Sequence, residues 1–141
     1  LFDSLLQEGE WVSGEWLALA HGTRYDLAGL EPFVAFDLWR KDGDQRIRYN
    51  HDTVAERCYA YLTLAPTIHD GGPLSISEAL DMVGHRIYGE LDEPEGAVWR
   101  VERKGKVDYL AKYVRPEKEN GCYLPEVSGL EPVWHWRPER L

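Results

Sequence analysis

Apolar and polar residues alternate in several short stretches of the chain, and this pattern is typical of β-strands. The first stretch, Glu10 to Ala20, predicts a strand interrupted at Gly14. The second, Phe33 to Arg40, leads through a turn at Lys41 to Asp44 into a third strand, Gln45 to Tyr49. An Asp-Gly pair between two such runs predicts a β-hairpin, because glycine tolerates the positive φ that the turn requires.

Beyond residue 50 the spacing of apolar residues changes from two to that of a helix. Apolar side chains recur at Val54, Cys58, Tyr61 and Leu62. Asp52 or Thr53 is the candidate N-cap of this helix. Ser75, followed three residues later by Glu78, has the form of a capping box and predicts a second helix that ends at Gly84.

From Gly96 the alternating pattern returns. It predicts strands over residues 97–102 and 107–114, joined by a hairpin turn across 103–106, whereas the proline-containing tail beyond Pro116 predicts irregular structure. Strands, then helices, then strands predict an α+β fold of mostly antiparallel β-sheets with flanking helices. The 141 residues fit one domain.

The formal net charge of -9 argues against a surface that binds nucleic acid over its whole extent. Basic residues nevertheless gather in one stretch, at Arg100, Arg103, Lys104, Lys106, Lys112 and Arg115. The sequence therefore predicts a basic strand pair within an acidic protein, and any contact with a polynucleotide is expected to be local.

Three further observations bound the class of protein. The sequence has neither a long apolar run nor a basic and apolar leader, so we expect a cytoplasmic location. The distance between Cys58 and Cys122 indicates neither a disulfide framework nor a zinc site. No HExxH, Gly-x-Ser-x-Gly or Walker-type pattern is found, so zinc-enzyme, serine-hydrolase and P-loop chemistry lack support.

Three segments carry candidate chemistry: Gly14 to Leu17 (GEWL), Phe33 to Asp37 (FVAFD) and Glu95 to Arg115 (EGAVWRVERKGKVDYLAKYVR). Their order and spacing resemble motifs III, IIIa, IV and V of the covalent nucleotidyltransferase superfamily, particularly of ATP-dependent RNA ligases, over roughly residues 12 to 115. The resemblance implies that residues 1–141 are a single, partial RNA ligase adenylation domain with the nucleotidyltransferase fold. It also implies ATP and Mg²⁺ as cofactors, and RNA 5′-phosphate and 3′-hydroxyl ends as substrates, joined through enzyme-AMP and RNA-adenylate.

The resemblance gives the first two segments a role in holding adenosine. Phe36 would stack on the adenine, with Phe33 as the alternative ring, and Glu15 would accept hydrogen bonds from the ribose hydroxyls. Trp16 would point to the opposite face of the strand and pack. Without the flanking motifs, an aromatic residue in a strand is usually part of the core, and a strand glutamate is usually solvated.

The third segment would act on the phosphates. Glu95 would engage the metal ion, Lys112 would contact the α-phosphate, and both are expected to be catalytic. Many family members have a second lysine two positions after the first; Val114 stands there, and Arg115 substitutes only if the backbone bulges. The structural alternatives are a turn glutamate and a lysine at a sheet edge.

Motif I, Lys-x-Asp-Gly, supplies the nucleophilic lysine in this family and should precede motif III. No lysine precedes Glu15, so we expect an upstream segment to carry it, and the chain itself should not form lysyl-AMP. The similar run Arg40 to Gly43 has arginine in the place of the nucleophile and is predicted to be a hairpin turn.

Several other functions remain open on the sequence alone. DNA ligation or mRNA capping would use the same type of site, and capping would prefer GTP. A catalytically inactive module would bind nucleotide or RNA reversibly without a covalent product. An α+β interaction domain with accidental motif matches would lack nucleotide affinity altogether.

Overall fold

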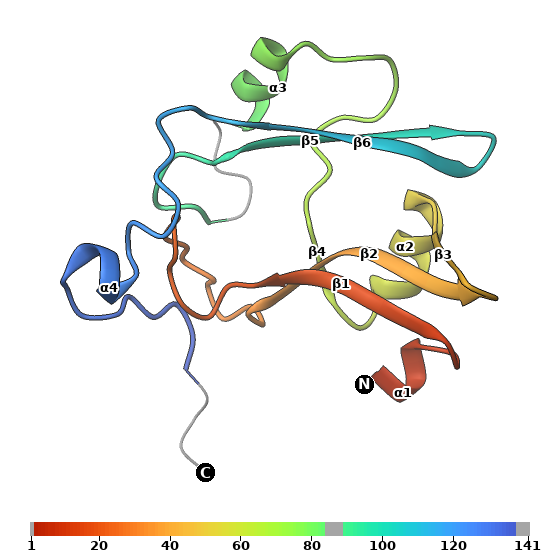
Figure 1. Ribbon diagram of the computed structural model, residues 1–141, viewed down its shortest axis with the longest axis horizontal. Helices are drawn as coiled ribbons and strands as arrows, with labels where there is room; N and C mark the ends of the chain where they lie inside the picture. The colour runs from red at the N-terminus through yellow and green to blue at the C-terminus, as the bar shows by residue number, and fades with distance from the viewer. Residues whose placement is uncertain (1, 84–88, 138–141) are drawn as a thin grey trace. The chain divides into compact units, whose positions relative to one another are not determined.

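The structure is a computed structural model that describes residues 2–83 and 89–137. It is an α+β protein with antiparallel sheets and short helices, which confirms the predicted fold class. In chain order the elements are α1 (Phe2–Leu5), β1 (Glu10–Trp16), β2 (Phe33–Asp42), β3 (Gln45–Arg48), α2 (His51–Cys58), β4 (Thr63–Leu64), α3 (Ile76–Val83), β5 (Gly96–Arg103), β6 (Lys106–Val114) and α4 (Pro125–Ser128) (Figure 1).

The chain forms two compact units, each of which is described by itself. The first unit comprises Leu1–Trp16, Phe33–Ala65 and Trp99–Ala111. The second comprises Leu17–Pro32, Pro66–Val98 and Lys112–Leu141.

A four-stranded sheet organises the first unit. Strands β1, β2 and β3 are antiparallel neighbours in that order, and β4 pairs with β2 in parallel. The core cluster consists of Leu5 from α1, Leu38 from β2, and Val54 and Cys58 from α2, so α1 and α2 contribute to one core with the sheet. Burial of these apolar side chains is the main stabilising contribution that holds the helices to the strands.

The first predicted strand is shorter than expected. β1 ends at Trp16 rather than at Ala20, because the next residues bond to other segments of the second unit. Leu17 N donates to Pro32 O at 2.7 Å, and Ala20 N donates to Val133 O at 2.8 Å. The alternating pattern continues through residue 20 because these residues have one buried side, but their partners lie in the C-terminal segment.

The helix after residue 50 differs at both ends from the prediction. Its N-cap is Asn50, whose side chain accepts a hydrogen bond from Thr53 N at 2.8 Å, and neither Asp52 nor Thr53 is the cap. It ends at Cys58. The apolar residues that follow instead lead into β4, where Thr63 and Leu64 pair with β2. The apolar residues at 61 and 62 have helical spacing, but pairing of the following residues with β2 determined the structure here.

The predicted capping box is present at the start of α3. Ser75 N donates to Glu78 Oε2 at 2.9 Å, and Glu78 N donates to Ser75 Oγ at 3.2 Å. The helix is described to Val83, and its predicted end at Gly84 lies outside the described residues.

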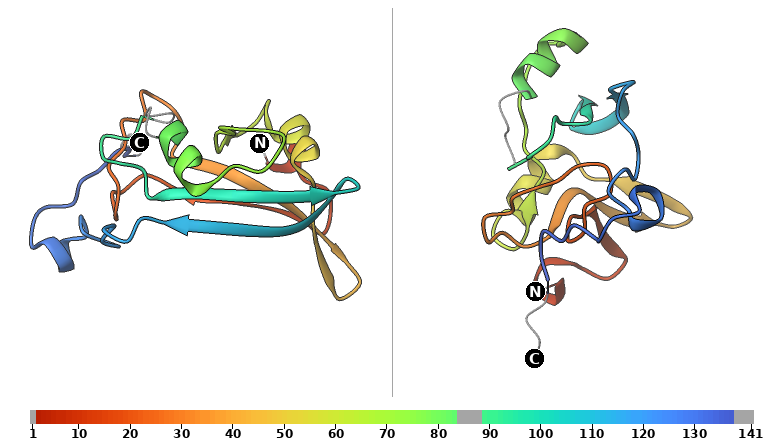
Figure 2. Two further views of the ribbon diagram at one scale, coloured as in Figure 1. Left: turned by 90° about the horizontal axis from the view of Figure 1, so that it is seen from above. Right: turned by 90° about the vertical axis from the view of Figure 1, so that its left-hand side faces the viewer.

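Both predicted hairpins are present, with tighter turns than the sequence indicated. In β2–β3 the pair Asp42 and Gln45 closes a two-residue loop whose first residue, Gly43, has a φ of 59°. In β5–β6 the two loop residues, Lys104 and Gly105, have φ of 53° and 71°, as a type I′ turn requires. Figure 2 shows β5 and β6 running side by side as a two-stranded ribbon.

The tail is more ordered than predicted. It includes α4, which ends at Gly129 with a φ of 68°, and an isolated β-bridge between Trp134 and Leu19. These contacts make the C-terminal segment part of the second unit.

Candidate functional site

Glu15 and Phe36 lie on neighbouring strands of the first unit, β1 and β2. Ser13 pairs with Asp37 and Gly14 with Ala35, so Phe36 between them has no partner on β1. This is a β-bulge, a feature that redirects a side chain and is frequent beside active sites. The bulged Phe36 is 46% exposed.

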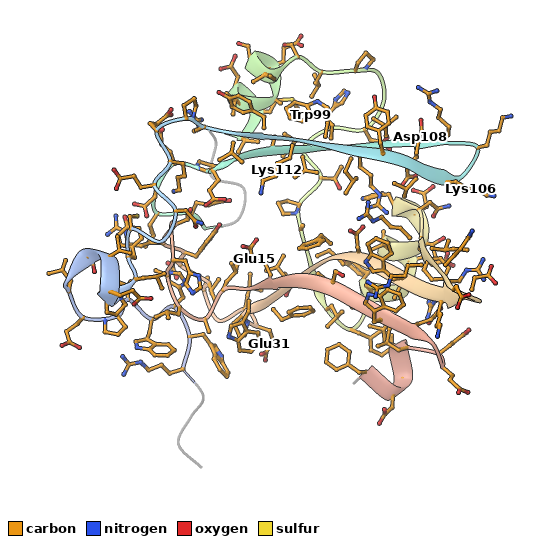
Figure 3. All side chains as sticks on the ribbon, viewed as in Figure 1. Glu15, Glu31, Trp99, Lys106, Asp108 and Lys112 are labelled. Carbon is orange, nitrogen blue, oxygen red and sulfur yellow. The ribbon has the colours of Figure 1, made fainter. Side chains whose placement is uncertain are left out.

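The other aromatic side chains of this region lie differently from Phe36. A Cβ on Gly14 would stand 2.5 Å from Cζ of Phe33, so the Phe33 ring covers this glycine and requires it. Trp16, which was expected to pack, is 59% exposed. Glu15 is exposed and pairs in register with Val34 (Figure 3).

Asp37 is a site feature that the sequence did not single out. Its carboxylate is buried, with a side chain 4% exposed, and it forms ion pairs with Arg100 Nη1 and with Arg48 Nε, the latter at 3.1 Å. Arg100 also donates to Glu102 Oε1 at 2.7 Å. Asp37 therefore ties β2, directly after the bulge, to β3 and β5. The signal in the sequence was one charge within the apolar run FVAFDL.

Arg115 belongs to the second unit and is surrounded by acceptors. Its backbone N donates to Glu95 O at 2.8 Å, and its Nε donates to Pro94 O at 3.1 Å. Its Nη1 lies 3.7 Å from a carboxylate oxygen of Glu93 and 3.9 Å from one of Glu117. In this arrangement Arg115 holds the segment that carries Glu95 against the end of β6.

Glu95 precedes β5 and has an exposed side chain. Its Oε1 would lie 3.2 Å from a Cβ on Gly22, so this carboxylate stands against a buried glycine. At the next position, a Cβ on Gly96 would stand 1.9 Å from Tyr113 O. The close approach of β5 to β6 thus requires glycine after Glu95, which accounts for the Glu-Gly pair.

An exposed carboxylate such as that of Glu95 could supply one ligand to Mg²⁺. Mg²⁺ is commonly held by one or two carboxylates together with phosphate oxygens and water. Within residues 2–83 and 89–137, no group of three or more His, Cys, Asp or Glu side chains is arranged to hold a metal ion. A single carboxylate could therefore hold Mg²⁺ here only together with oxygens from a bound ligand or from water.

Lys112 lies on β6 with its side chain exposed (Figure 3). In the part of the chain that the structure describes, no carboxylate lies within ion-pair distance of it. Three other basic residues of the stretch, Arg100, Arg103 and Arg115, form ion pairs, whereas Lys104 and Lys106 are exposed and form none within the described residues. Lys112 is thus one of three lysines of the stretch that are available to an anion, whereas its three arginines are paired.

The run that resembles motif I is part of the β2–β3 hairpin, as expected. Arg40 to Asp42 form the end of β2, and Gly43 begins the loop. Arg40 Nη2 lies 3.8 Å from Asp42 Oδ2. An arginine in this hairpin is no nucleophile.

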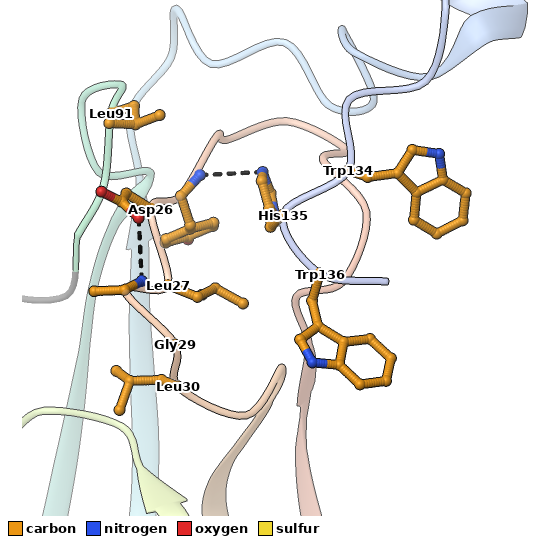
Figure 4. A pocket seen from close by; sticks show the side chains of 10 residues that line it. Asp26, Leu27, Gly29, Leu30, Leu91, Trp134, His135 and Trp136 are labelled. Carbon is orange, nitrogen blue, oxygen red and sulfur yellow. Dashed lines mark hydrogen bonds between the residues drawn. The ribbon is translucent and has the colours of Figure 1, made fainter. Parts of the chain in front are cut away.

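A hollow of about 400 Å³ lies in the second unit, between the loop of residues 25–30 and the segment Trp134 to Trp136 (Figure 4). His135 joins its two sides. Tyr25 N donates to Nε2 of His135 at 3.1 Å, so Nδ1 carries the proton and donates to Leu17 O at 2.6 Å. The imidazole thereby has a structural role.

A second structural ion pair in this unit connects Arg24 and Asp92. Arg24 Nη2 donates to Asp92 Oδ1 at 2.7 Å, and the guanidinium lies 5.2 Å from the centre of the Tyr123 ring. The hydrogen bonds from Arg24 hold the pKa of Asp92 well below its usual range. Sequence spacing alone did not indicate this pair, because 68 positions separate its members.

Comparison with known proteins gives one positive result. A protein-family model described as RNA ligase matches residues 2–114, which include Glu15, Phe36, Glu95 and Lys112 but not Arg115. Searches of curated proteins and of solved structures found no match. Among the described residues, no helix has the length and apolar character needed to cross a membrane.

Proposed function

Because the chain belongs to the RNA ligase family, we propose that it is the nucleotide-holding part of an ATP-dependent RNA ligase adenylation domain. The match over residues 2–114 carries this proposal. In the reaction, a lysine nitrogen attacks the α-phosphorus of ATP and pyrophosphate leaves. The AMP then passes to an RNA 5′-phosphate, and an RNA 3′-hydroxyl displaces it to form the phosphodiester. Residues 1–141 would contribute motifs III to V as one partial domain.

Glu15 and Phe36 hold the adenosine in this proposal. The bulge leaves the Phe36 ring exposed, and an exposed ring on a strand offers a flat surface to a purine. Glu15 has a carboxylate that accepts hydrogen bonds from both ribose hydroxyls. The neighbouring strands β1 and β2 keep both side chains on a rigid sheet, which favours orientation of the bound nucleotide.

Glu95 and Lys112 act on the phosphates. Lys112 stabilises the charge that develops on the α-phosphate oxygens, and Glu95 orients the metal ion there. Mg²⁺, when bound with the nucleotide, neutralises phosphate charge and assists departure of pyrophosphate. Arg115 keeps the Glu95 segment in place through its bonds to Pro94 and Glu95, so its role is to position a catalytic group.

A second candidate is a catalytically inactive module that binds nucleotide or RNA. In this candidate function Glu15, Phe36 and Lys112 would hold the nucleotide in the same way, and no nucleophilic lysine would be required. Such a module would bind ATP reversibly and would form no covalent product. DNA ligation and mRNA capping are further alternatives with the same site, and preference for GTP over ATP would indicate capping.

Nucleotide affinity of single-residue variants tests the proposed site. We expect Phe36→Ala and Lys112→Ala each to weaken ATP binding by about tenfold, measured by isothermal titration calorimetry with Mg²⁺. Phe2→Ala is the matched control for the ring, because Phe2 is 47% exposed and Phe36 46%. Lys106→Ala is the control for the lysine, as another exposed lysine of β6.

Both controls should change the affinity by less than about twofold. Equal affinities of all four variants and the unmodified chain would contradict the proposed site.

Intact-mass spectrometry after incubation with ATP and Mg²⁺ tests whether the chain itself supplies a nucleophile. The chain should gain no AMP, and a covalent adenylate would show that one of its own residues replaces the motif I lysine.

A further inference from the structure

Two tryptophans lie side by side on the sheet of the first unit. Trp11 of β1 and Trp39 of β2 are register partners, with ring centroids 6.0 Å apart and planes inclined by 3°. The indole Nε1 of Trp39 donates to Ser13 Oγ at 3.0 Å, which fixes this ring. Both rings are partly exposed. Together with Lys41 and Arg46 they form what we call the tryptophan face.

Two arginines contact these rings through their guanidinium groups. The Arg48 guanidinium lies 4.2 Å from the centre of the Trp39 ring and is also paired with buried Asp37. The Arg46 guanidinium lies 6.0 Å from the centre of the Trp11 ring, and its side chain is exposed. Within the described residues, Arg46 forms no ion pair. Arg48 is therefore held between the Trp39 ring and Asp37, whereas Arg46 is available to an anion.

The surroundings of Arg46 add charge and space. Lys41 is its register partner across β2 and β3 and is also exposed. A hollow of about 530 Å³ lies beside Trp11, lined by Lys41, Asp44, Gln45 and Arg46. Residues 39–48 contain four basic and two acidic side chains, although the whole chain has a net charge of -9. Basic side chains thus outnumber acidic ones in this hairpin, and an excess of positive charge favours a polyanion.

The tryptophan face lies on the same side of β1 as Glu15. Side chains alternate along a strand, so Trp11, Ser13 and Glu15 share one face of β1, which is continuous through the bulge in β2. Glu15 lies four positions after Trp11, which corresponds to about 13 Å along the strand. A strand of nucleic acid on Trp11 would therefore lead along β1 toward the candidate ribose-binding glutamate.

We propose that the tryptophan face is a docking surface for single-stranded RNA, in which Trp11 stacks with a base while Lys41 and Arg46 contact phosphates. Partly exposed rings beside flexible cations are the combination that single-stranded nucleic acids require, because every base has a π-face and every linkage a negative charge. The choice of RNA over another polyanion rests on the proposed function. The surface itself rests on the rings and cations.

Fluorescence anisotropy of a labelled single-stranded RNA, titrated with the full chain at low salt, tests this surface. We expect Arg46→Glu to weaken binding by about tenfold and to lower the salt dependence of the affinity. Trp11→Leu keeps an apolar side chain but removes stacking, and should weaken binding by at least about fivefold. Urea unfolding of each variant verifies that the fold is retained.

Arg137→Glu is the matched control. Arg137 is also an exposed arginine over an indole, 5.2 Å from the centre of the Trp134 ring, but it belongs to the second unit. This change should alter RNA affinity by less than about twofold. An equal loss for Arg46→Glu and Arg137→Glu would overturn the proposal, because only net charge would then matter.

Two further measurements are needed. One shows which polyanion binds the tryptophan face, and the other separates this surface from the proposed nucleotide site. Polyglutamate that displaces the RNA as well as unlabelled single-stranded RNA does would overturn the stacking contact and favour an acidic protein partner. ATP titration of Arg46→Glu should give the affinity of the unmodified chain. RNA binding that depends on Arg46 in a chain without ATP affinity would support this surface and reject the nucleotide site; absence of RNA binding would reject the surface alone.

Discussion

At the scale of single residues, Glu10 illustrates how the first unit uses a buried charge. Its side chain is 3% exposed and accepts hydrogen bonds from Arg57 Nη1 at 2.7 Å and from the Tyr49 hydroxyl at 2.6 Å. The hydrogen bonds from Arg57 are the largest cause of a Glu10 pKa lowered to about 2. The carboxylate thus joins β1, α2 and the residue after β3.

This lowered pKa predicts a specific dependence of stability on pH. Because the folded pKa lies below the unfolded value of about 4.5, the contribution is fully present above pH 4.5 and is lost as the pH falls toward 2. We expect it to amount to about 2 to 3 kcal/mol of the free energy of unfolding. Urea unfolding between pH 2 and pH 7 should show Glu10→Gln with a lower stability at pH 7 and a flatter profile.

Glu56→Gln provides the control for this prediction, because Glu56 is an exposed glutamate of α2. Its profile should follow that of the unmodified chain. A Glu10→Gln profile as steep as that of the unmodified chain would show that other carboxylates account for the acid sensitivity.

At the scale of elements, the β5–β6 turn contains a strained backbone conformation at Lys104 that a substitution could relieve. Lys104 has a φ of 53°, a left-handed conformation that side chains with a Cβ rarely adopt, and Asn is tolerated there much better than Lys. Lys104→Asn would create the Asn-Gly pair that type I′ hairpins favour. We expect a gain of about 0.5 to 1 kcal/mol, measured as a higher melting temperature in thermal unfolding.

Lys106→Asn is the control for the turn, since Lys106 lies in β6 beyond the two loop residues and asparagine is a poor strand former. It should bring no gain. Equal effects of both substitutions would indicate that removal of a positive charge, rather than backbone conformation, determines the change.

At the scale of the whole molecule, the RNA ligase match ends at residue 114, yet the second unit depends on residues beyond it. Ala20 N donates to Val133 O, and Tyr25 N donates to His135. These bonds satisfy backbone groups of the segment 17–32, which connects β1 to β2. The C-terminal segment is thus an integral part of the fold.

Truncation after residue 114 should therefore loosen the segment 17–32. We expect the amide hydrogens of Ala20 and Tyr25 to exchange at least about tenfold faster, because their acceptors are removed, while Tyr49 in the first unit stays protected. Hydrogen exchange with residue-level readout measures this. His135→Ala should accelerate Tyr25 but not Ala20, and unchanged exchange in the truncated chain would contradict the prediction.

The sequence predicted local structure where short-range chemistry determines it. The capping box of Ser75 and Glu78 and the glycines of both hairpins act within a few positions of the chain, so their patterns were sufficient. The end of β1 and the strand at Thr63 depended on distant partners, and the sequence misplaced both. The candidate site residues came from motif order, and their roles stay predictions.

The sequence by itself determined the α+β class, the hairpins and the residue types of the candidate site, since alternation, turn chemistry and motif order are properties of neighbouring positions. Only the tertiary structure decided which of those residues have free side chains. Phe36 is exposed at a bulge where it has no partner on β1, Arg115 is paired with Glu93 and Glu117, and Lys112 has no carboxylate near it within the described residues. Exposure and pairing depend on which distant segments meet, and that is settled by packing.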